Sequence, residues 1–169
     1  MSATSIKRKL QNISIDLNAT NYRVDSVINY LNNLNISNVS RGTKYFDDLT
    51  ANLNTTIQKL QELYNDSSKG LEILLRRYNT DLLSSVRLCI NLKSKNNYMV
   101  ENLKAIQDNI DDLQNCTDPD CAVTLYYYIV EAVKVVSRET GEYLNLKQKL
   151  QNIKQQSQYW NSQIIITRW

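Results

Sequence analysis

The stretch NCTDPDC, residues 115–121, lies between two long amphipathic patterns and contains the only proline of the chain. Thr117 is expected to be the N-cap of the helix that follows, because its hydroxyl can accept a hydrogen bond from an unpaired amide of the first turn. Asp120, three residues later, can complete a capping box. Pro119 suits a first helical turn, where its backbone needs no N–H. The stretch therefore predicts a short corner between two antiparallel helices.

The three cysteines of the chain allow one disulfide and leave one thiol. Cys116 and Cys121 flank the corner and are expected to be the bonded pair. A continuous helix between Cys89 and Cys116 would separate them by roughly 40 Å, whereas a disulfide needs Cα atoms within about 7 Å. Cys89 is therefore expected to be a small buried apolar residue. A packing that folds Cys89 back onto the corner is the alternative.

Apolar residues that recur at spacings of three and four predict long helices on both sides of the corner. The first helix should span about residues 2–37. A break follows at residues 38–42, where Gly42 can take the left-handed conformation that ends helices, and Thr43 is expected to be the next N-cap. The stripe of the first helix consists of Ile6, Leu10, Ile13, Leu17, Val24, Val27, Leu31 and Leu34, with Thr20 in one slot.

The middle of the chain leaves the helix boundaries open. Residues 65–70 form a turn-like cluster, which fits either a short turn or a kink in one long helix. A weaker break at residues 94–97 would end a helix that starts near residue 43. Another helix would then occupy residues 96–113.

The last helix should run from the corner to about residue 159, with an irregularity at Gly141. Its stripe consists of Tyr126, Ile129, Val133, Val136, Tyr143, Leu146, Leu150, Ile153 and Trp160. Because Tyr126 fits this stripe, at least one of Tyr127 and Tyr128 should be exposed. Exposed tyrosines would offer a recognition surface, since they provide large contact area at low entropic cost. A wide buried face is the alternative.

The apolar tail at residues 164–169 contains Ile164, Ile165, Ile166 and Trp169. Three consecutive isoleucines cannot share one helix face, and apolar groups of this size usually cover something. The tail is expected either to fold back and seal the end of the bundle or to dock on a second molecule. Docking would give a homodimer or a contact with a partner protein.

No stretch alternates with period two for long enough to predict a strand. The expected fold is all-α, an elongated antiparallel bundle of four to five long amphipathic helices in one domain, residues 1–169. A parallel coiled-coil oligomer is the rival fold. The interruptions between the helical patterns favour the bundle, because a continuous coiled coil needs none.

The composition excludes most catalytic chemistry. The chain has no histidine, which removes the usual general base and the commonest metal ligand, and its three glycines cannot form a phosphate-binding loop. The net charge is +3 and the basic residues are scattered, which is not typical of a nucleic-acid-binding surface. No apolar run reaches the length of a membrane span. We therefore expect no catalytic, cofactor-binding or metal-binding residue.

Seven Asn-x-Ser/Thr sequons favour secretion, since about three would arise by chance in a chain of this composition. A disulfide at the corner also suits an oxidising compartment. Met1 is then an added start on a mature chain without its signal peptide, and the alternative is a cytoplasmic protein, because the first residues lack an apolar signal. The candidate glycosylation sites are Asn12, Asn18, Asn35, Asn38, Asn54, Asn65 and Asn115.

The abundant Asn and Tyr, the sequons and the cysteine-bearing corner at residues 115–121 resemble those of small secreted all-helical insect proteins, such as salivary or haemolymph binding proteins. The resemblance implies a binding function and transfers no functional residue. The expected function is therefore non-enzymatic binding of another protein. One alternative is a carrier of lipid or of a small apolar ligand in the bundle core, and another is an intracellular coiled-coil scaffold.

Overall fold

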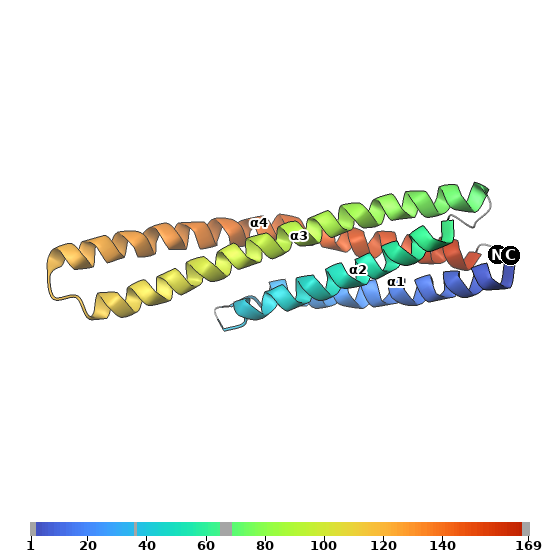
Figure 1. Ribbon diagram of the computed structural model, residues 1–169. Coiled ribbons are helices and arrows are strands. Elements are labelled where there is room, and N and C mark those ends of the chain that lie inside the picture. The colour runs from blue at the N-terminus through green and yellow to red at the C-terminus, as the bar shows by residue number, and fades with distance from the viewer. Residues whose placement is uncertain (1–2, 36, 65–68, 167–169) are drawn as a thin grey trace.

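The computed structural model describes residues 3–35, 37–64 and 69–166 (Figure 1). Its elements are α1 (Ala3–Asn32), the 3₁₀ helix η1 (Val39–Arg41), α2 (Gly42–Tyr64), α3 (Lys69–Gln114) and α4 (Pro119–Ile166). The described residues contain no strand. The predicted all-α bundle of long helices is therefore confirmed.

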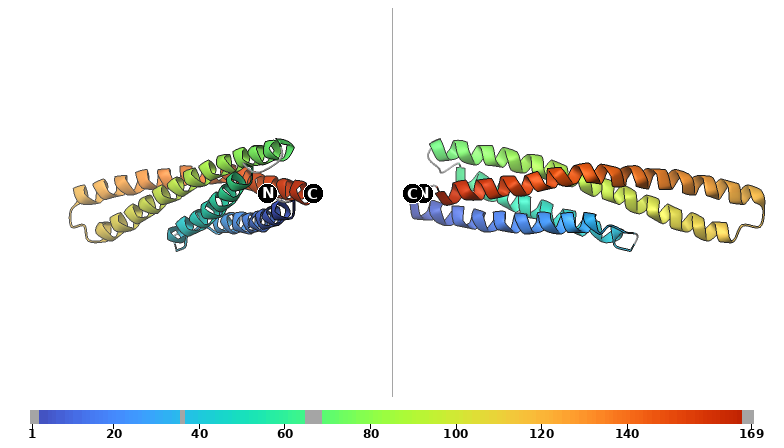
Figure 2. Two further views of the ribbon diagram at one scale, coloured as in Figure 1. Left: turned by 45° about the vertical axis from the view of Figure 1, so that its right-hand side comes forward. Right: turned by 180° about the vertical axis from the view of Figure 1, so that it is seen from behind.

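The four helices form a ring in which α1 and α3 each pack against both α2 and α4. α1 and α2 have 30 and 23 residues, whereas α3 and α4 have 46 and 48. At 1.5 Å per residue, the long pair extends about 30 Å beyond the short pair, and Figures 1 and 2 show it projecting as a hairpin. We call the four-helix part the body and the projecting hairpin, residues 100–138, the arm.

The core of the body is built from heptad-spaced side chains of all four helices. Burying each large apolar side chain contributes about 1.5–3 kcal/mol, so this interdigitated core is the main stabilising element of the fold. Its fully or nearly fully buried members include Ile13, Leu17 and Val24 of α1, Phe46, Leu49 and Leu53 of α2, Leu75, Tyr78 and Leu92 of α3, and Leu150 and Trp160 of α4.

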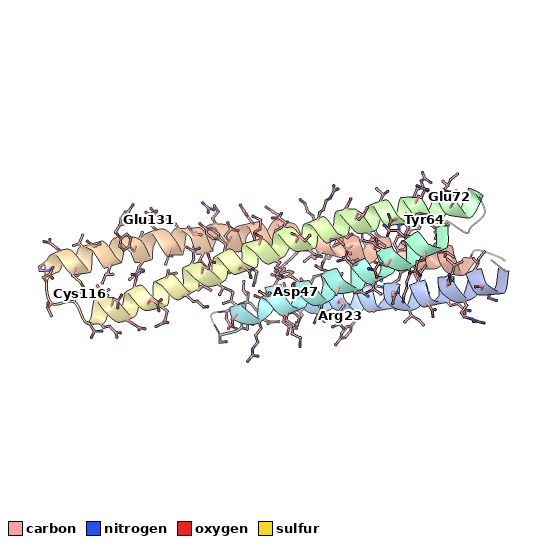
Figure 3. The ribbon with its side chains drawn as sticks, in the orientation of Figure 1. Arg23, Asp47, Tyr64, Glu72, Cys116 and Glu131 are labelled. Carbon is pink, nitrogen blue, oxygen red and sulfur yellow. A yellow bond between two sulfur atoms is a disulfide. The ribbon has the colours of Figure 1, made fainter. Side chains whose placement is uncertain are left out.

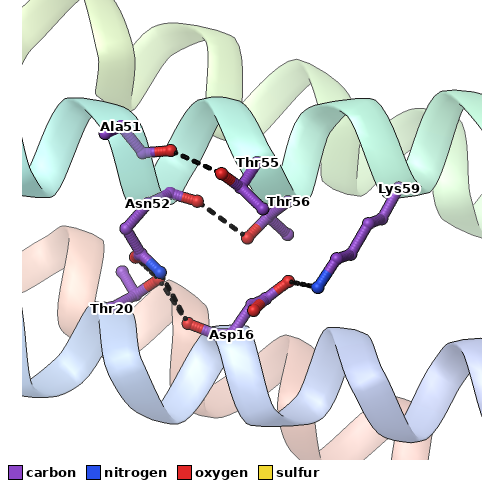
Figure 4. Close-up of polar contacts among 7 residues, drawn as sticks. All are labelled: Asp16, Thr20, Ala51, Asn52, Thr55, Thr56 and Lys59. Carbon is purple, nitrogen blue, oxygen red and sulfur yellow. Dashed lines mark hydrogen bonds and ion pairs between the residues drawn. The ribbon is translucent and has the colours of Figure 1, made fainter.

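Polar contacts set the register between α1 and α2 (Figure 4). Thr20 occupies a core position of α1, and its hydroxyl lies 2.9 Å from Asp16 O and 2.5 Å from Asn52 Oδ1, so its one proton has two acceptors within reach. Lys59 of α2 forms an ion pair of 2.7 Å with the Asp16 carboxylate. A buried hydroxyl is tolerated only with such partners, so these contacts hold α2 at one position along α1.

The prediction that Gly42 ends the first helix in a left-handed conformation is wrong. α1 ends at Asn32, and Gly42 begins α2 with φ −59° and ψ −37°, which is right-handed helix. A glycine is needed for a different reason: a Cβ at this position would lie 2.6 Å from Asn96 Oδ1. Thr43, the expected N-cap, lies inside α2.

The break predicted at residues 94–97 is also wrong, because α3 is one continuous helix. Polar residues occur there because Asn96 is buried where the body ends. Its Oδ1 accepts a hydrogen bond of 2.6 Å from Tyr30 Oη, and its Nδ2 donates one of 3.3 Å to the Val39 carbonyl. Local composition therefore reflects a tertiary contact here and not a turn.

Three further boundaries differ from expectation or are resolved by the fold. α2 and α3 are separate helices that pack against each other, so a single kinked helix is excluded. Of the turn-like cluster between them, residues 65–68 lie outside the described residues. α4 continues without interruption through Gly141, where a Cβ would meet nothing within 4 Å, and it extends past residue 159 to Ile166.

Asp118, and not Thr117, caps α4. The Asp118 carboxylate accepts a hydrogen bond of 2.9 Å from the backbone N–H of Cys121, three residues on. The helix begins at Pro119, which therefore occupies the first helical position. The prediction of Thr117 placed the cap one residue too early. With Thr117 as the cap, Pro119 would be the second residue of the helix and not the first.

The predicted disulfide joins Cys116 to Cys121 with their Cα atoms 5.9 Å apart. Figure 3 shows that it lies at the far end of the arm. Cys89 is free and buried in the body core, as predicted, and burial raises the pKa of its thiol to about 12.

Candidate functional site

One heptad position of α4 faces α1 along the body, but α1 does not extend along the arm. The position comprises Tyr126, Val133, Thr140, Lys147, Lys154 and Asn161. Lys154 forms an ion pair of 2.9 Å with Asp25 of α1, and Asn161 donates a hydrogen bond of 3.3 Å to Asn18. Past the end of α1 the same position carries Val133 and Tyr126, and both are exposed. The residues are polar where α1 is present and apolar where it is absent.

A second heptad position, three residues before the first, lies on the rim of the bundle. In the body it carries Leu144, Gln151 and Gln158, of which the two glutamines are exposed although α1 is present. In the arm it carries Val123, Val130 and Ser137, and the Val123 side chain is 68% exposed. The arm portion of α4 therefore has a wider apolar surface than the body portion, although it has fewer neighbouring helices to cover that surface.

α3 shows the matching change on its own core position. The heptad members Leu75, Leu82, Cys89 and Asn96 are all buried beneath α1 and α2. The next two members, Leu103 and Ile110, lie in the arm, where Leu103 is half-buried and Ile110 is 37% exposed. The apolar core position thus continues beyond the helices that bury it.

These residues define one surface of the hairpin, which we call the arm face. It consists of Leu103 and Ile110 of α3 and Val123, Tyr126, Val130 and Val133 of α4. Tyr126 and Val133 continue the position that faces α1 in the body, Leu103 and Ile110 continue the α3 position that is buried there, and Val123 and Val130 border this side. A contiguous apolar surface of this kind on a protein usually covers or binds another apolar surface.

The end of the arm is strongly acidic. Residues 105–130, which we call the acidic tip, contain five aspartates and no lysine or arginine, so their net charge is −5. The remaining residues therefore carry +8, because the whole chain carries +3. The aspartates are Asp108, Asp111, Asp112, Asp118 and Asp120.

The base of the arm is held by ion pairs between α3 and α4. Lys95 contacts Glu142 and lies 3.5 Å from the buried carboxylate of Glu139. The hydrogen bond to Glu142 raises the pKa of Lys95, and the same bond lowers the pKa of Glu142. Glu139 is also 3.7 Å from Arg138. Lys95 of α3 and Glu142 of α4 are thus both charged at neutral pH, and their ion pair joins the two helices where the body ends.

Two pockets flank this junction. One, of about 360 Å³, is lined by residues that include Leu34, Leu103, Val136 and Lys147. The other, of about 230 Å³, is lined by Val39, Ser40, Val100, Leu103, Lys104 and Gln107. Both form because α1 and α2 stop while α3 and α4 continue, and each combines apolar walls with one lysine.

The structure brings only part of the predicted binding surface together. Tyr127 and Tyr128 are exposed, with ring centroids 6.0 Å apart, as the prediction of an exposed tyrosine required. Tyr126, which the prediction placed in the buried stripe, is the most exposed of the three at 63%, and the alternative of a wide buried face is wrong. Tyr126 lies on the arm face, whereas the next two residues point around the helix away from it.

Other predicted residues are only partly placed. The side chains of Ile164, Ile165, Ile166 and Trp169 lie outside the described residues, so the two hypotheses for the tail stay predictions. Among the sequons, Asn12, Asn18, Asn35, Asn54 and Asn115 are exposed, Asn38 is half-buried, and Asn65 lies outside the described part. Asn115 is the only one in the arm, and it lies at the corner.

Sequence reasoning missed most of the arm face. Val123 and Val130 have no role in the helix stripes that the sequence predicts. The signal was present as a second a/d pattern at residues 123, 126, 130 and 133, beside the one that packs the hairpin. Two adjacent apolar stripes on one helix indicate contact with two neighbouring elements.

Comparison of the chain with protein-family models, with curated proteins and with solved structures found no match. Within the described ranges, no helix combines the length and the apolar character that crossing a membrane requires. The arm face therefore has to be interpreted from its own chemistry.

Proposed function

We propose that this protein is a non-enzymatic helical protein that acts by binding another protein, and that the arm face is its binding surface. The observation that carries the proposal is the change from polar to apolar residues at one heptad position of α4, which carries Lys154 and Asn161 beside α1 and Val133 and Tyr126 beyond its end. Covering an exposed valine or leucine side chain contributes about 1.5–3 kcal/mol. Tyr126 adds the kind of aromatic side chain that is enriched in protein interfaces.

The distribution of the sequons supports secretion and a free arm face. Six of the seven sequons precede residue 66, and the seventh, Asn115, is at the corner, so glycans would cover the body and leave the arm face bare. The disulfide at the tip is compatible with an oxidising compartment. Loss of mass on treatment of the native protein with an N-glycosidase would support secretion, and an unchanged mass would count against it.

The absence of histidine and of a glycine-rich loop supports a non-enzymatic function. The carrier hypothesis has one supporting observation, the half-apolar pocket of about 360 Å³ at the junction, which is at the small end for a ligand site. The arm face offers a larger apolar surface, and we therefore prefer a protein partner.

A photo-crosslinking amino acid at Val123 tests the proposed function. The matched control is Ile15 of α1, whose side chain is 65% exposed against 68% for Val123 but lies on the body. Each variant is irradiated in the extracellular fluid from which the protein comes, and the adducts are identified by mass spectrometry. We expect one defined protein adduct from position 123 and none from position 15. Equal labelling at both positions, or no adduct at position 123, would refute the arm face as a binding surface.

A further inference from the structure

We infer that the occupant of the arm face is a second copy of this chain, and that two arms pack antiparallel about a two-fold axis to form a second four-helix bundle. The inference rests on the proposed function, because it names the partner of the same surface. It is carried by three independent features of the arm: its length, its charge and the junction pockets.

The space beside α3 and α4, beyond the ends of α1 and α2, is as long as the arm itself. In the body, α3 and α4 are completed by a second antiparallel helix pair, α1 and α2. Where that pair ends, two further helices, antiparallel to each other and as long as the arm, would continue the ring. A second arm supplies such a pair, and its insertion restores the ring of four along the whole length of α3 and α4. The contact is self-complementary, as a two-fold axis requires.

The heptad spacing of the arm face suits this packing. Val123, Tyr126, Val130 and Val133 follow the alternating spacings of three and four that small-angle helix packing uses. The face is about 23 Å long over residues 100–114 and about 20 Å wide across two helices. Two such faces meeting would bury roughly 900 Å² in projection, which is close to the lower limit for a specific interface.

The charge distribution selects the antiparallel orientation. Parallel arms would bring two acidic tips together, each with a net charge of −5. Antiparallel arms instead place each tip beside the junction of the other copy. There Lys104 and Lys147 line the two pockets and form no ion pair within the described part of the chain. Complementary charge of this kind steers association and fixes register more than it adds affinity.

The junction pockets are the third feature. They lie where the end of a second arm would abut the connection between α1 and α2, at residues 33–41. Leu103 lines both pockets, so the two pockets are neighbours at the place where the molecule changes from four helices to two. The corner of the second copy, residues 115–118, is short and carries polar side chains that suit these lysine-bearing pockets.

Sedimentation equilibrium of the full-length protein tests the inference. We expect a dimer at micromolar concentration, and at least tenfold weaker association for Tyr126→Glu, because each copy would bury an unpaired carboxylate. Ile15→Glu is the matched control and should leave the dimer intact. Lys104→Glu should also weaken association, and low salt should strengthen that of the wild type. Circular dichroism of the variants checks that each monomer is folded.

Engineered cysteines test the orientation. Val130 lies near the middle of the arm and Val123 nearer its tip, so in an antiparallel pair only position 130 meets its own counterpart. With a short bismaleimide, Val130→Cys should form a covalent dimer and Val123→Cys should not. The native cysteines do not react, because Cys89 is buried and the other two are bonded. Cross-linking at both positions would show parallel arms and overturn the inference.

The result separates this inference from the proposed function. A wild-type protein that stays monomeric, or a dimer that Tyr126→Glu leaves unchanged, overturns the second copy as the occupant. The proposed function then stands if the photo-crosslinker at Val123 labels a different protein, and it fails as well if that position labels nothing. An adduct of the chain with itself supports the second copy as the occupant and the arm face as a binding surface, but it does not support binding of a different protein there.

Discussion

Tyr30 Oη donates a hydrogen bond of 2.6 Å to Asn96 Oδ1, and both side chains are buried at the level where the bundle changes from four helices to two. Tyr30 belongs to the last turns of α1, whereas Asn96 lies in the middle of α3. The Val39 carbonyl of η1 accepts a hydrogen bond of 3.3 Å from Asn96 Nδ2 and lies 3.1 Å from Tyr30 Oη. This cluster therefore fixes the point on α3 at which α1 and α2 end and the arm begins.

Removing the hydroxyl of Tyr30 tests that cluster. Tyr30→Phe leaves the buried Asn96 Oδ1 without its donor, which should lower the free energy of unfolding by about 1–3 kcal/mol. Tyr45→Phe is the matched control, because this ring stacks on Tyr30 at 5.3 Å but is partly exposed, and its change should stay within about 0.5 kcal/mol. Urea unfolding measures both, and equal effects would mean that the buried hydroxyl has no special role.

The same tyrosine should make stability depend on alkaline pH. Burial raises the pKa of Tyr30 from 10.0 to about 12, so the fold disfavours its phenolate. The contribution of the neutral Tyr30 side chain to the free energy of unfolding is complete below about pH 10 and is lost as the pH rises towards about 12. At 1.36 kcal/mol per pKa unit, the upper limit of this contribution is about 2.7 kcal/mol.

The measurement is the difference in unfolding free energy between wild type and Tyr30→Phe from about pH 9 to about pH 11.5. Burial also raises the pKa values of Tyr78 and Tyr143, and both residues are present in the two proteins, so only the part of the Tyr143 shift that comes from Tyr30 differs between them. We expect the difference to shrink as the pH rises. A difference that stays constant would contradict the raised pKa of Tyr30.

Two glycine substitutions should have opposite effects. Gly42→Ala places a methyl group 2.6 Å from Asn96 Oδ1, so it must displace the buried cluster and should destabilise the protein by about 1–3 kcal/mol. Gly141→Ala meets nothing within 4 Å in an exposed helix interior and should stabilise it by about 0.5–1 kcal/mol. Melting temperatures that move in the same direction for both variants would contradict this assignment.

The helix cap at the corner can be tested by a pair of neighbouring substitutions. Asp118→Ala removes the acceptor of the Cys121 N–H and should cost about 1 kcal/mol in the local stability of the arm. Thr117→Ala should have almost no effect. Because the arm has few covering helices, it should open separately from the body. Amide hydrogen exchange over the first turns of α4 is therefore the appropriate measurement, and a larger effect of Thr117→Ala would restore the original cap assignment.

Much of the fold could be predicted from local patterns alone. The heptad positions of α1 and α2, the antiparallel corner and the bonding of Cys116 to Cys121 follow from spacing, from the single proline and from loop length. These features depend on interactions between residues within a few helical turns, so they can be predicted without knowing where the other helices lie. The predicted cap was displaced by one residue, because the position of Pro119 within the first turn decides it.

The sequence determined by itself which side of each helix is apolar, but only the tertiary structure decided which parts of those sides are covered. Asn96 resembled a break because its partners are 66 and 57 residues away along the chain. Tyr126 and Val133 continue a position that faces α1 in the body, and they are exposed because α1 ends first. A residue's spacing sets its direction on the helix, whereas its burial depends on where the neighbouring helix stops.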